Sequence, residues 1–90
     1  MANPVKLTEK QALYTSLVSD LVSPMVAHPD DVEVTCGNPL GGIEILVAPN
    51  ESDVGRLIGK GGATIAALRR VVEFAARRNG DVVALEIEAD

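Results

Sequence analysis

Residues 57–65 read Leu-Ile-Gly-Lys-Gly-Gly-Ala-Thr-Ile, a stretch that holds three glycines and one lysine. An apolar, helix-like run from Ser52 precedes it, and a longer helical pattern from Ala63 to Arg78 follows it. A glycine turn that feeds a helix N-terminus presents unpaired N–H groups and the positive end of the helix dipole. With the charge of Lys60 at its tip, this stretch predicts a turn that binds the phosphates of a nucleic acid.

The size and composition of the chain indicate one small folded domain. It has 90 residues, of which 47% are hydrophobic, enough for a single modest core. We expect residues 1–8 to form a flexible N-terminal segment and residues 9–90 to form the domain. No apolar run approaches the ~20 residues that span a bilayer, and the N-terminus lacks a signal-peptide pattern, so we expect a cytoplasmic protein without a membrane segment.

The net charge of −5 conceals an uneven distribution. Residues 55–80 contain six bases and one acid, Glu73, and the rest of the chain contains two bases and twelve acids. Because the local field steers a polyanion, a basic segment can bind nucleic acid on an acidic protein. The alternative is that these side chains only solvate a long helix.

Helical and strand patterns follow one another along the chain. Thr8 and Gln11 form a capping-box pattern for a helix over 9–22, which Pro24 ends or kinks. Six residues at helical spacing predict its buried face: Leu13, Tyr14, Leu17, Val18, Leu21 and Met25. Alternating apolar residues predict strands over 32–36 and 43–48, which the short turn between them joins as an antiparallel hairpin.

The second half of the chain predicts two helices and a final strand. Asn50 caps a short helix that ends at Gly59, with Asp53 in its first turn where the dipole favours acids. The helix over 63–78 stops at Asn79-Gly80, and a strand over 82–88 follows. On a helical wheel the core face of the longer helix consists of Ile65, Leu68, Val72 and Ala75.

We therefore expect helices on one face of a three-stranded sheet. The open face would carry Glu33, Glu44, Glu86 and Glu88. Because this face repels phosphates and offers no aromatic side chains for stacking, RNA binding across the sheet is not expected.

Other chemistries fit the sequence poorly. A Walker A loop needs Ser or Thr after its lysine, where this chain has Gly61, and a dinucleotide fingerprint needs glycine where it has Thr64. His28 has no second histidine or cysteine nearby, and the single Cys36 allows neither a disulfide nor a metal cluster. No carboxylate pair or nucleophile–base pair lies near the glycine turn, so we expect neither an enzyme nor a cofactor.

The motif Ile58-Gly59-Lys60-Gly61-Gly62-Ala63-Thr64-Ile65 resembles the I-G-x-x-G-x-x-I signature of the KH domain, whose G-x-x-G loop clamps about four nucleotides of backbone. The additional helix and strand before this unit resemble the type II arrangement. The resemblance implies an α+β fold with the order α-β-β-α-α-β and a three-stranded mixed sheet with three helices on one face. The strand over 43–48 would then run parallel to that over 82–88.

Residues 28–34, His-Pro-Asp-Asp-Val-Glu-Val, and 53–59, Asp-Val-Gly-Arg-Leu-Ile-Gly, extend the match to KhpA-like proteins, which are small bacterial KH-domain RNA-binding proteins. This resemblance covers about residues 10–88. It implies a cytoplasmic single-stranded RNA-binding protein, an RNA chaperone linked to cell shape, that forms a homodimer or pairs with a KhpB/Jag-like KH protein. Relatives often carry a base where this chain has Ala63.

We predict eight RNA-binding residues: Arg56, Ile58, Gly59, Lys60, Gly61, Gly62, Ile65 and Arg69. The amides of residues 59–62 would hold phosphates with help from Lys60 and Arg56. Ile58 and Ile65, together with Val47, would form the apolar floor under the bases, and Arg69 would reach the wall of the groove.

A second surface is predicted on the longer helix. Ala67, Val71 and Phe74 form an apolar flank away from the core stripe, and exposed apolar patches often mark a partner surface. We interpret it as a dimer interface, the alternative being that Phe74 tucks under the first helix. A different function also stays open: a KH-fold dimerisation module with weak or no RNA binding, which the acidic net charge and Ala63 favour.

Overall fold

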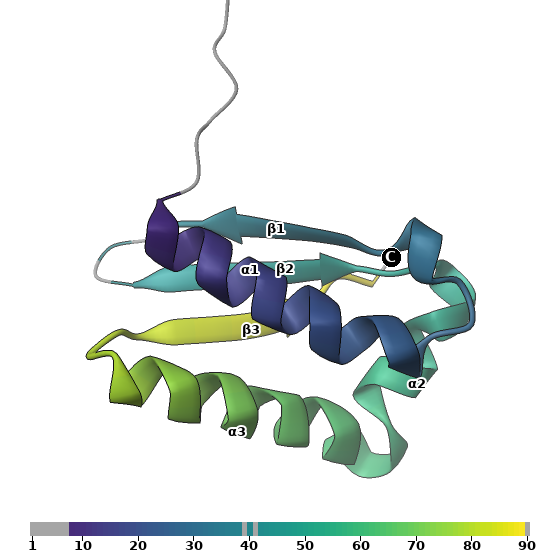
Figure 1. Cartoon of the computed structure of the whole chain (residues 1–90). Helices are drawn as coiled ribbons and strands as arrows, with labels where there is room; N and C mark the ends of the chain where they lie inside the picture. The colour runs from purple at the N-terminus through teal and green to yellow at the C-terminus, as the bar shows by residue number, and fades with distance from the viewer. Residues whose placement is uncertain (1–7, 39, 41, 90) are drawn as a thin grey trace, which may run out of the picture.

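The computed structural model describes residues 8–38, 40 and 42–89 and shows three helices on one face of a three-stranded sheet (Figure 1). The predicted flexible segment, apart from Thr8, lies outside the described residues. The elements are α1 (Glu9–Val22), β1 (Glu33–Gly37), β2 (Ile43–Ala48), α2 (Val54–Ile58), α3 (Ala63–Arg78) and β3 (Val83–Ile87). Short 3₁₀ turns cover Ser23–Met25, Pro29–Asp31, Glu51–Asp53 and Lys60–Gly62. The predicted α+β class and element order are confirmed.

The sheet has the strand order β1-β2-β3. β1 pairs with β2 antiparallel, with Val34 opposite Val47, and β2 pairs with β3 parallel, with Ile45 opposite Leu85. The predicted hairpin and the predicted parallel pair are both confirmed. β3 is therefore an edge strand, and it lies next to α3 (Figure 1).

α1 begins and ends where the sequence predicts. The Thr8 hydroxyl accepts a hydrogen bond from the Gln11 amide at 3.1 Å, and the Gln11 side chain accepts one from the Thr8 amide at 2.9 Å. At the other end, Pro24 lies in the 3₁₀ turn that follows Val22. The two bonds between Thr8 and Gln11 satisfy amide groups that a helix N-terminus otherwise leaves unpaired.

The buried face of α1 is narrower than predicted. Tyr14, Val18 and Val22, spaced four residues apart, are fully buried or nearly so. Leu13 precedes Tyr14 by one residue, which turns it about 100° away on a helix, and it is 54% exposed. The prediction that Leu13 lies on the core face was wrong, because the stripe of Tyr14, Val18 and Val22 is the one that enters the core.

The core lies between the sheet and the three helices. α3 buries Leu68, Val72 and Ala76, and the predicted core residues Ile65 and Ala75 are only half-buried. The rest of the core comes from the other elements: Tyr14, Val18, Val22, Ile45, Val47, Leu57, Val83 and Leu85. None of the helices among the described residues has the length and apolar character that a membrane span needs.

A polar cluster ties α1 to the turn between α3 and β3. The buried Tyr14 hydroxyl donates to the Asp81 carboxylate at 2.6 Å, and the Lys10 ammonium pairs with the same carboxylate at 2.8 Å. The Lys10 bond, followed by that from Tyr14, holds the pKa of Asp81 below its ordinary value. This cluster fixes the end of α3 that is remote from the glycine turn.

Candidate nucleic-acid interface

The turn between α2 and α3 depends on glycine conformations. Gly59 has φ 77° and ψ 170°, and Gly61 has φ 64° and ψ 18°. The Gly59 conformation is essentially restricted to glycine. A Cβ at residue 59 would also overlap the Thr64 hydroxyl oxygen, whereas a Cβ at residue 61 would meet nothing within 4 Å. The first turn of α3 therefore packs directly on Gly59, and Gly61 faces open space.

The main-chain donors of the turn divide into two groups. The Gly59 amide donates to the Gly55 carbonyl at 2.8 Å, and the Gly62 amide donates to the Gly59 carbonyl at 3.1 Å. The Ala63 amide donates to the Lys60 carbonyl. Within the described part of the chain, the amides of Lys60 and Gly61 have no acceptor. The donors available to a phosphate are thus those of Lys60 and Gly61 rather than those of Gly59 and Gly62.

Two cationic side chains, those of Arg56 and Lys60, belong to α2 and to the turn itself. Lys60 is exposed and forms no ion pair with any residue that the structure describes. Arg56 is 61% exposed, and its Nε lies 3.3 Å from an Asp53 oxygen. Asp53 engages only Nε of the five N–H donors that an arginine carries. The Nη groups of Arg56 therefore stay available to a ligand.

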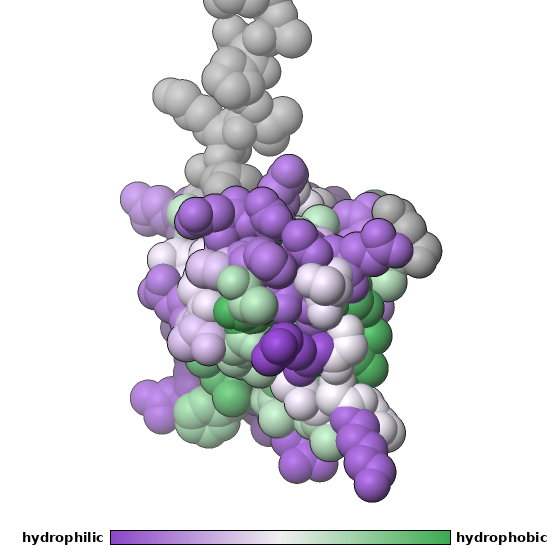
Figure 2. Space-filling model, turned by 90° about the vertical axis from the view of Figure 1, so that its right-hand side faces the viewer, coloured by the Kyte–Doolittle hydropathy of each residue, from purple (hydrophilic) through white to green (hydrophobic). Residues whose placement is uncertain are grey.

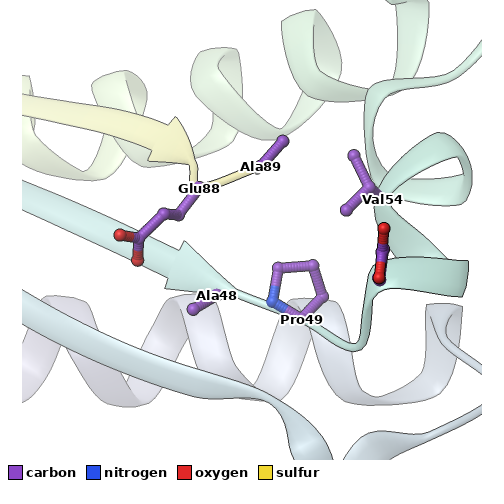
Figure 3. Close-up of a pocket in the computed structure, with 6 residues that line it drawn as sticks. Ala48, Pro49, Val54, Glu88 and Ala89 are labelled. Carbon is purple, nitrogen blue, oxygen red and sulfur yellow. The ribbon is translucent and has the colours of Figure 1, made fainter.

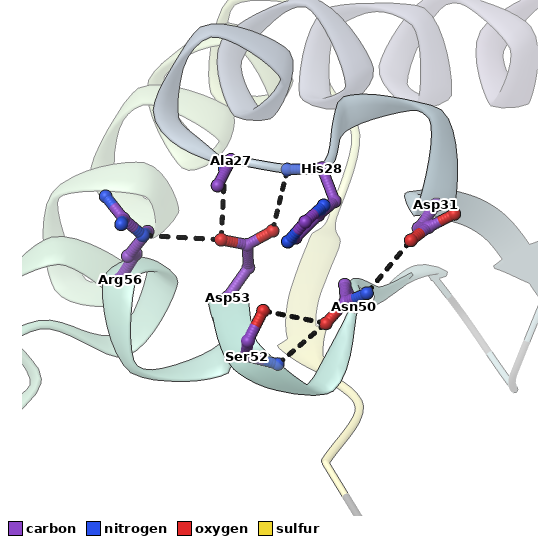
Figure 4. A network of polar contacts seen from close by, with 7 residues as sticks. All are labelled: Ala27, His28, Asp31, Asn50, Ser52, Asp53 and Arg56. Atoms are coloured by element: carbon purple, nitrogen blue, oxygen red, sulfur yellow. Dashed lines mark hydrogen bonds and ion pairs between the residues drawn. The ribbon is translucent and has the colours of Figure 1, made fainter.

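Asp53 fixes the start of α2, a role that the sequence analysis missed (Figure 4). Its carboxylate is fully buried and accepts hydrogen bonds from the Ala27 and His28 amides, each at 3.0 Å. The Ala27 bond is the main cause that lowers the pKa of Asp53, and the nearby charge of Arg56 acts in the same direction. Asp53 therefore ties the helix that carries Arg56 to the segment after α1.

A second set of bonds supports the same segment. The Asn50 side-chain oxygen accepts from the Ser52 amide at 2.8 Å, as predicted for a cap, and its nitrogen donates to Asp31 at 2.9 Å. The contribution of His28 to this region is its backbone amide, which donates to Asp53. Among the described residues there is no group of three or more His, Cys, Asp and Glu side chains that could hold a metal ion.

The apolar floor differs in one residue from the prediction. Ile58 and Ile65 are half-buried, so part of each side chain reaches the surface beside the turn. Val47 is fully buried in the middle strand, and its inclusion in the floor was wrong because helices cover that face of β2. Its β3 neighbour Ile87 is half-buried. The alternation in the last strand predicts that Ile87 faces the core, and it gives no sign that part of this side chain reaches the surface.

Arg69 lies on the wall of a groove between α3 and β3. Its Nε donates to the Leu85 carbonyl at 3.0 Å, and its Nη2 lies 3.0 Å from a Glu86 oxygen. The groove measures about 290 Å³. The sequence places Arg69 near the turn but carries no sign of these two partners, which are 16 and 17 residues away.

Acidic residues border the other side of α2. A pocket of about 490 Å³, which Pro49, Val54 and Ala89 surround, lies between the end of β2 and the start of α2 (Figure 3). Glu51 and Glu88 also line it, so it does not suit a phosphate. Seen from the α2 end, hydrophilic side chains lie beside apolar patches (Figure 2), a combination that suits charged phosphates joined to flat bases.

The outer face of α3 presents the predicted apolar flank to solvent. Val71 is 46% exposed and Phe74 is 63% exposed, and Ala67 is exposed as well. Phe74 does not tuck under α1.

Comparison with known proteins identifies relatives over most of the chain. The sequence model of the family "KhpA/KhpB, KH domain" matches residues 15–87. "RNA-binding protein KhpA" of Halalkalibacterium halodurans is 38% identical over 72 residues, which is 80% of this chain and 95% of the relative. The proteins of the same name from Bacillus subtilis and Listeria monocytogenes are 35% and 32% identical over 71 residues, covering 79% of this chain and 88% and 93% of the relatives.

Two glycine-to-alanine changes are expected to have opposite effects on stability. Gly59→Ala forces an alanine into a glycine-only conformation against Thr64 and should lower the free energy of unfolding by about 1–3 kcal/mol or more. Gly55→Ala meets nothing within 4 Å inside α2 and should raise it by about 0.5–1 kcal/mol. Urea titration followed by circular dichroism measures both, and equal effects would contradict the turn geometry.

Proposed function

The chain belongs to the KhpA/KhpB family of KH domains, and from this premise we propose that it binds single-stranded RNA through the turn between α2 and α3. The resemblance to KhpA-like type II KH domains, expected from the sequence, is confirmed. Membership of a non-enzymatic family agrees with the expectation of a binding protein rather than an enzyme.

The two unpaired amides at the tip of the turn are the observation that carries the proposal. The Lys60 and Gly61 N–H groups have no acceptor among the described residues, and the exposed Lys60 ammonium belongs to the same turn. A single phosphate group can accept hydrogen bonds from these two amides and also neutralise the charge of Lys60. Ile58 and Ile65 then offer apolar surface to the adjoining bases.

Binding of this kind is electrostatic and weakly selective for sequence. Phosphate contacts position a strand but do not read its bases. If Lys60, Arg56 and Arg69 each neutralise one phosphate, log K should fall against log salt with a slope of about −2. This dependence on salt is consistent with an RNA chaperone in the cytoplasm, which must bind many strands and release them.

A short footprint also favours a second RNA-binding module. Two linked sites can raise avidity by ~10²–10⁴, which either a homodimer or a KhpB-like KH partner would supply. The exposed flank of Ala67, Val71 and Phe74 is the proposed contact surface. A part in control of cell shape, implied by the resemblance, stays a prediction.

The alternative function is a dimerisation module with little RNA binding. The net charge of −5, the acidic pocket beside α2 and Ala63 after the last glycine of the turn favour it. Retention of labelled RNA on a filter that falls as salt rises supports the RNA-binding function, and the absence of retention supports the alternative.

Two acids in the turn should abolish RNA binding without unfolding the domain. In Lys60→Asp with Gly61→Asp, the carboxylates repel phosphate, and Asp is among the residues that tolerate the left-handed conformation of Gly61. We expect the affinity for a short single-stranded RNA, measured by fluorescence anisotropy at moderate salt, to fall more than about tenfold, or ~1.4 kcal/mol.

Arg78→Asp with Gly80→Asp is the matched control for this double variant. It makes the same change in charge at the far end of α3, where Gly80 also has positive φ and open space around it. This control should keep most of the affinity. Unaltered binding in the turn variant, or an equal loss in the control, would refute a local phosphate site.

A lysine on the outer face of α3 should dissociate the proposed dimer. Val71→Lys places a charge in the middle of the apolar flank, so a folded monomer is expected in sedimentation or light-scattering measurements of mass. Glu73→Lys adds the same side chain at an exposed position outside the flank and should leave the dimer intact. A Val71→Lys protein with unchanged oligomer mass would rule out this interface.

A further inference from the structure

Arg69 lies in a groove between α3 and β3 that two carboxylates, those of Glu73 and Glu86, also line. The arginine extends from α3 to the edge strand β3, where Nε donates to the Leu85 carbonyl and Nη2 pairs with Glu86, both at 3.0 Å. Arg69, Leu85 and Glu86 line the same groove, which measures about 290 Å³. Glu86 thus pairs with Arg69, a cation that would otherwise be available to RNA at the proposed site.

The main-chain bond fixes the guanidinium whichever anion it meets. Leu85 lies in the edge strand β3, and its carbonyl accepts the Arg69 bond on the side away from β2. Because that bond uses only Nε, the Nη groups can exchange one acceptor for another without moving the side chain out of the groove. Arg69 is therefore a positioned cation with an exchangeable partner.

Arg69 also lies in line with the glycine turn. It follows Ile65 by four residues on α3, so the two side chains share one face of the helix, one turn apart. A strand held at Lys60 and Gly61 that continues past Ile65 along this face meets Arg69 next. Its phosphate would reach the guanidinium edge whose Nη2 Glu86 holds in the free protein.

The ion pair itself is well suited to exchange. The Arg69 and Glu86 side chains are 40% and 53% exposed, and exposed pairs of this kind contribute little to stability. A carboxylate and a phosphate offer the guanidinium similar oxygen acceptors. The phosphate can replace the carboxylate directly.

We propose that Glu86 competes with RNA phosphate for the guanidinium of Arg69, and so lowers the affinity and speeds the release of RNA. The inference rests on the proposed function and concerns the same site. Glu86 acts through Arg69, because its carboxylate occupies Nη2 and offsets the charge of the guanidinium that a phosphate would otherwise meet.

A double-mutant cycle tests this coupling. The wild type, Glu86→Gln, Arg69→Gln and the double variant are titrated against one fluorescent single-stranded RNA. Glu86→Gln should bind about two- to fivefold more tightly, the range that corresponds to an exposed ion pair. In the Arg69→Gln background the same change should have no effect. An effect that persists there would overturn the proposal, because it would indicate direct repulsion of RNA by Glu86.

Glu88→Gln is the matched control, since Glu88 is exposed two residues further along the chain and forms no ion pair with the described residues. RNA dissociation, measured by stopped flow, should slow in Glu86→Gln and stay unchanged in Glu88→Gln. Equal rates in these two variants would overturn the proposal even if Arg69→Gln fails to fold. A wild type that binds no RNA would overturn the proposed function itself, a separate outcome from a wild type that binds and does not respond to Glu86→Gln.

Discussion

The contact between Gly59 and Thr64 is the constraint on which the candidate site depends. A side chain at residue 59 would overlap the Thr64 hydroxyl, and the backbone there adopts a conformation that glycine alone accepts readily. This contact lets α3 begin directly after α2. The amides of Lys60 and Gly61 consequently stand at the tip with no acceptor among the residues that the structure describes, where a longer connection could fold back and satisfy them.

Buried contacts of α2 on one side and of α3 on the other hold the turn in place. Leu57 is fully buried in the core, and the buried Asp53 ties the start of α2 to the amides after α1. Leu68 and Val72 anchor α3 against the sheet. A short helix of five residues has little stability of its own, so these anchors keep Arg56 and Lys60 in place. The turn then presents Arg56 and Lys60 to a polyanion at the start of the basic segment that continues along α3.

Local spacing predicted most of the fold, and long-range contacts explain what it missed. The capping box, the alternation of β2 and the glycine-ended helices each depend on residues a few positions apart. Leu13 and Val47 were misread because their exposure is decided by segments that approach only in the folded chain, and the bonds of Asp53 to the Ala27 and His28 amides lie beyond what local spacing indicates. For the candidate site, the sequence predicts the glycines and the cations, whereas the division of the amides and the pairing of Arg69 with Glu86 depend on the folded backbone and on residues far apart in the chain.

The central claim is that the Lys60 and Gly61 amides bind phosphate, and a two-dimensional ¹H–¹⁵N NMR titration with a short single-stranded RNA tests it most directly. A hydrogen bond to phosphate polarises the N–H bond and deshields its proton, so these two amide signals should shift most, and the shifts should diminish as salt rises. Shifts confined to the outer face of α3 or to the open face of the sheet, with the turn unchanged, would contradict the account.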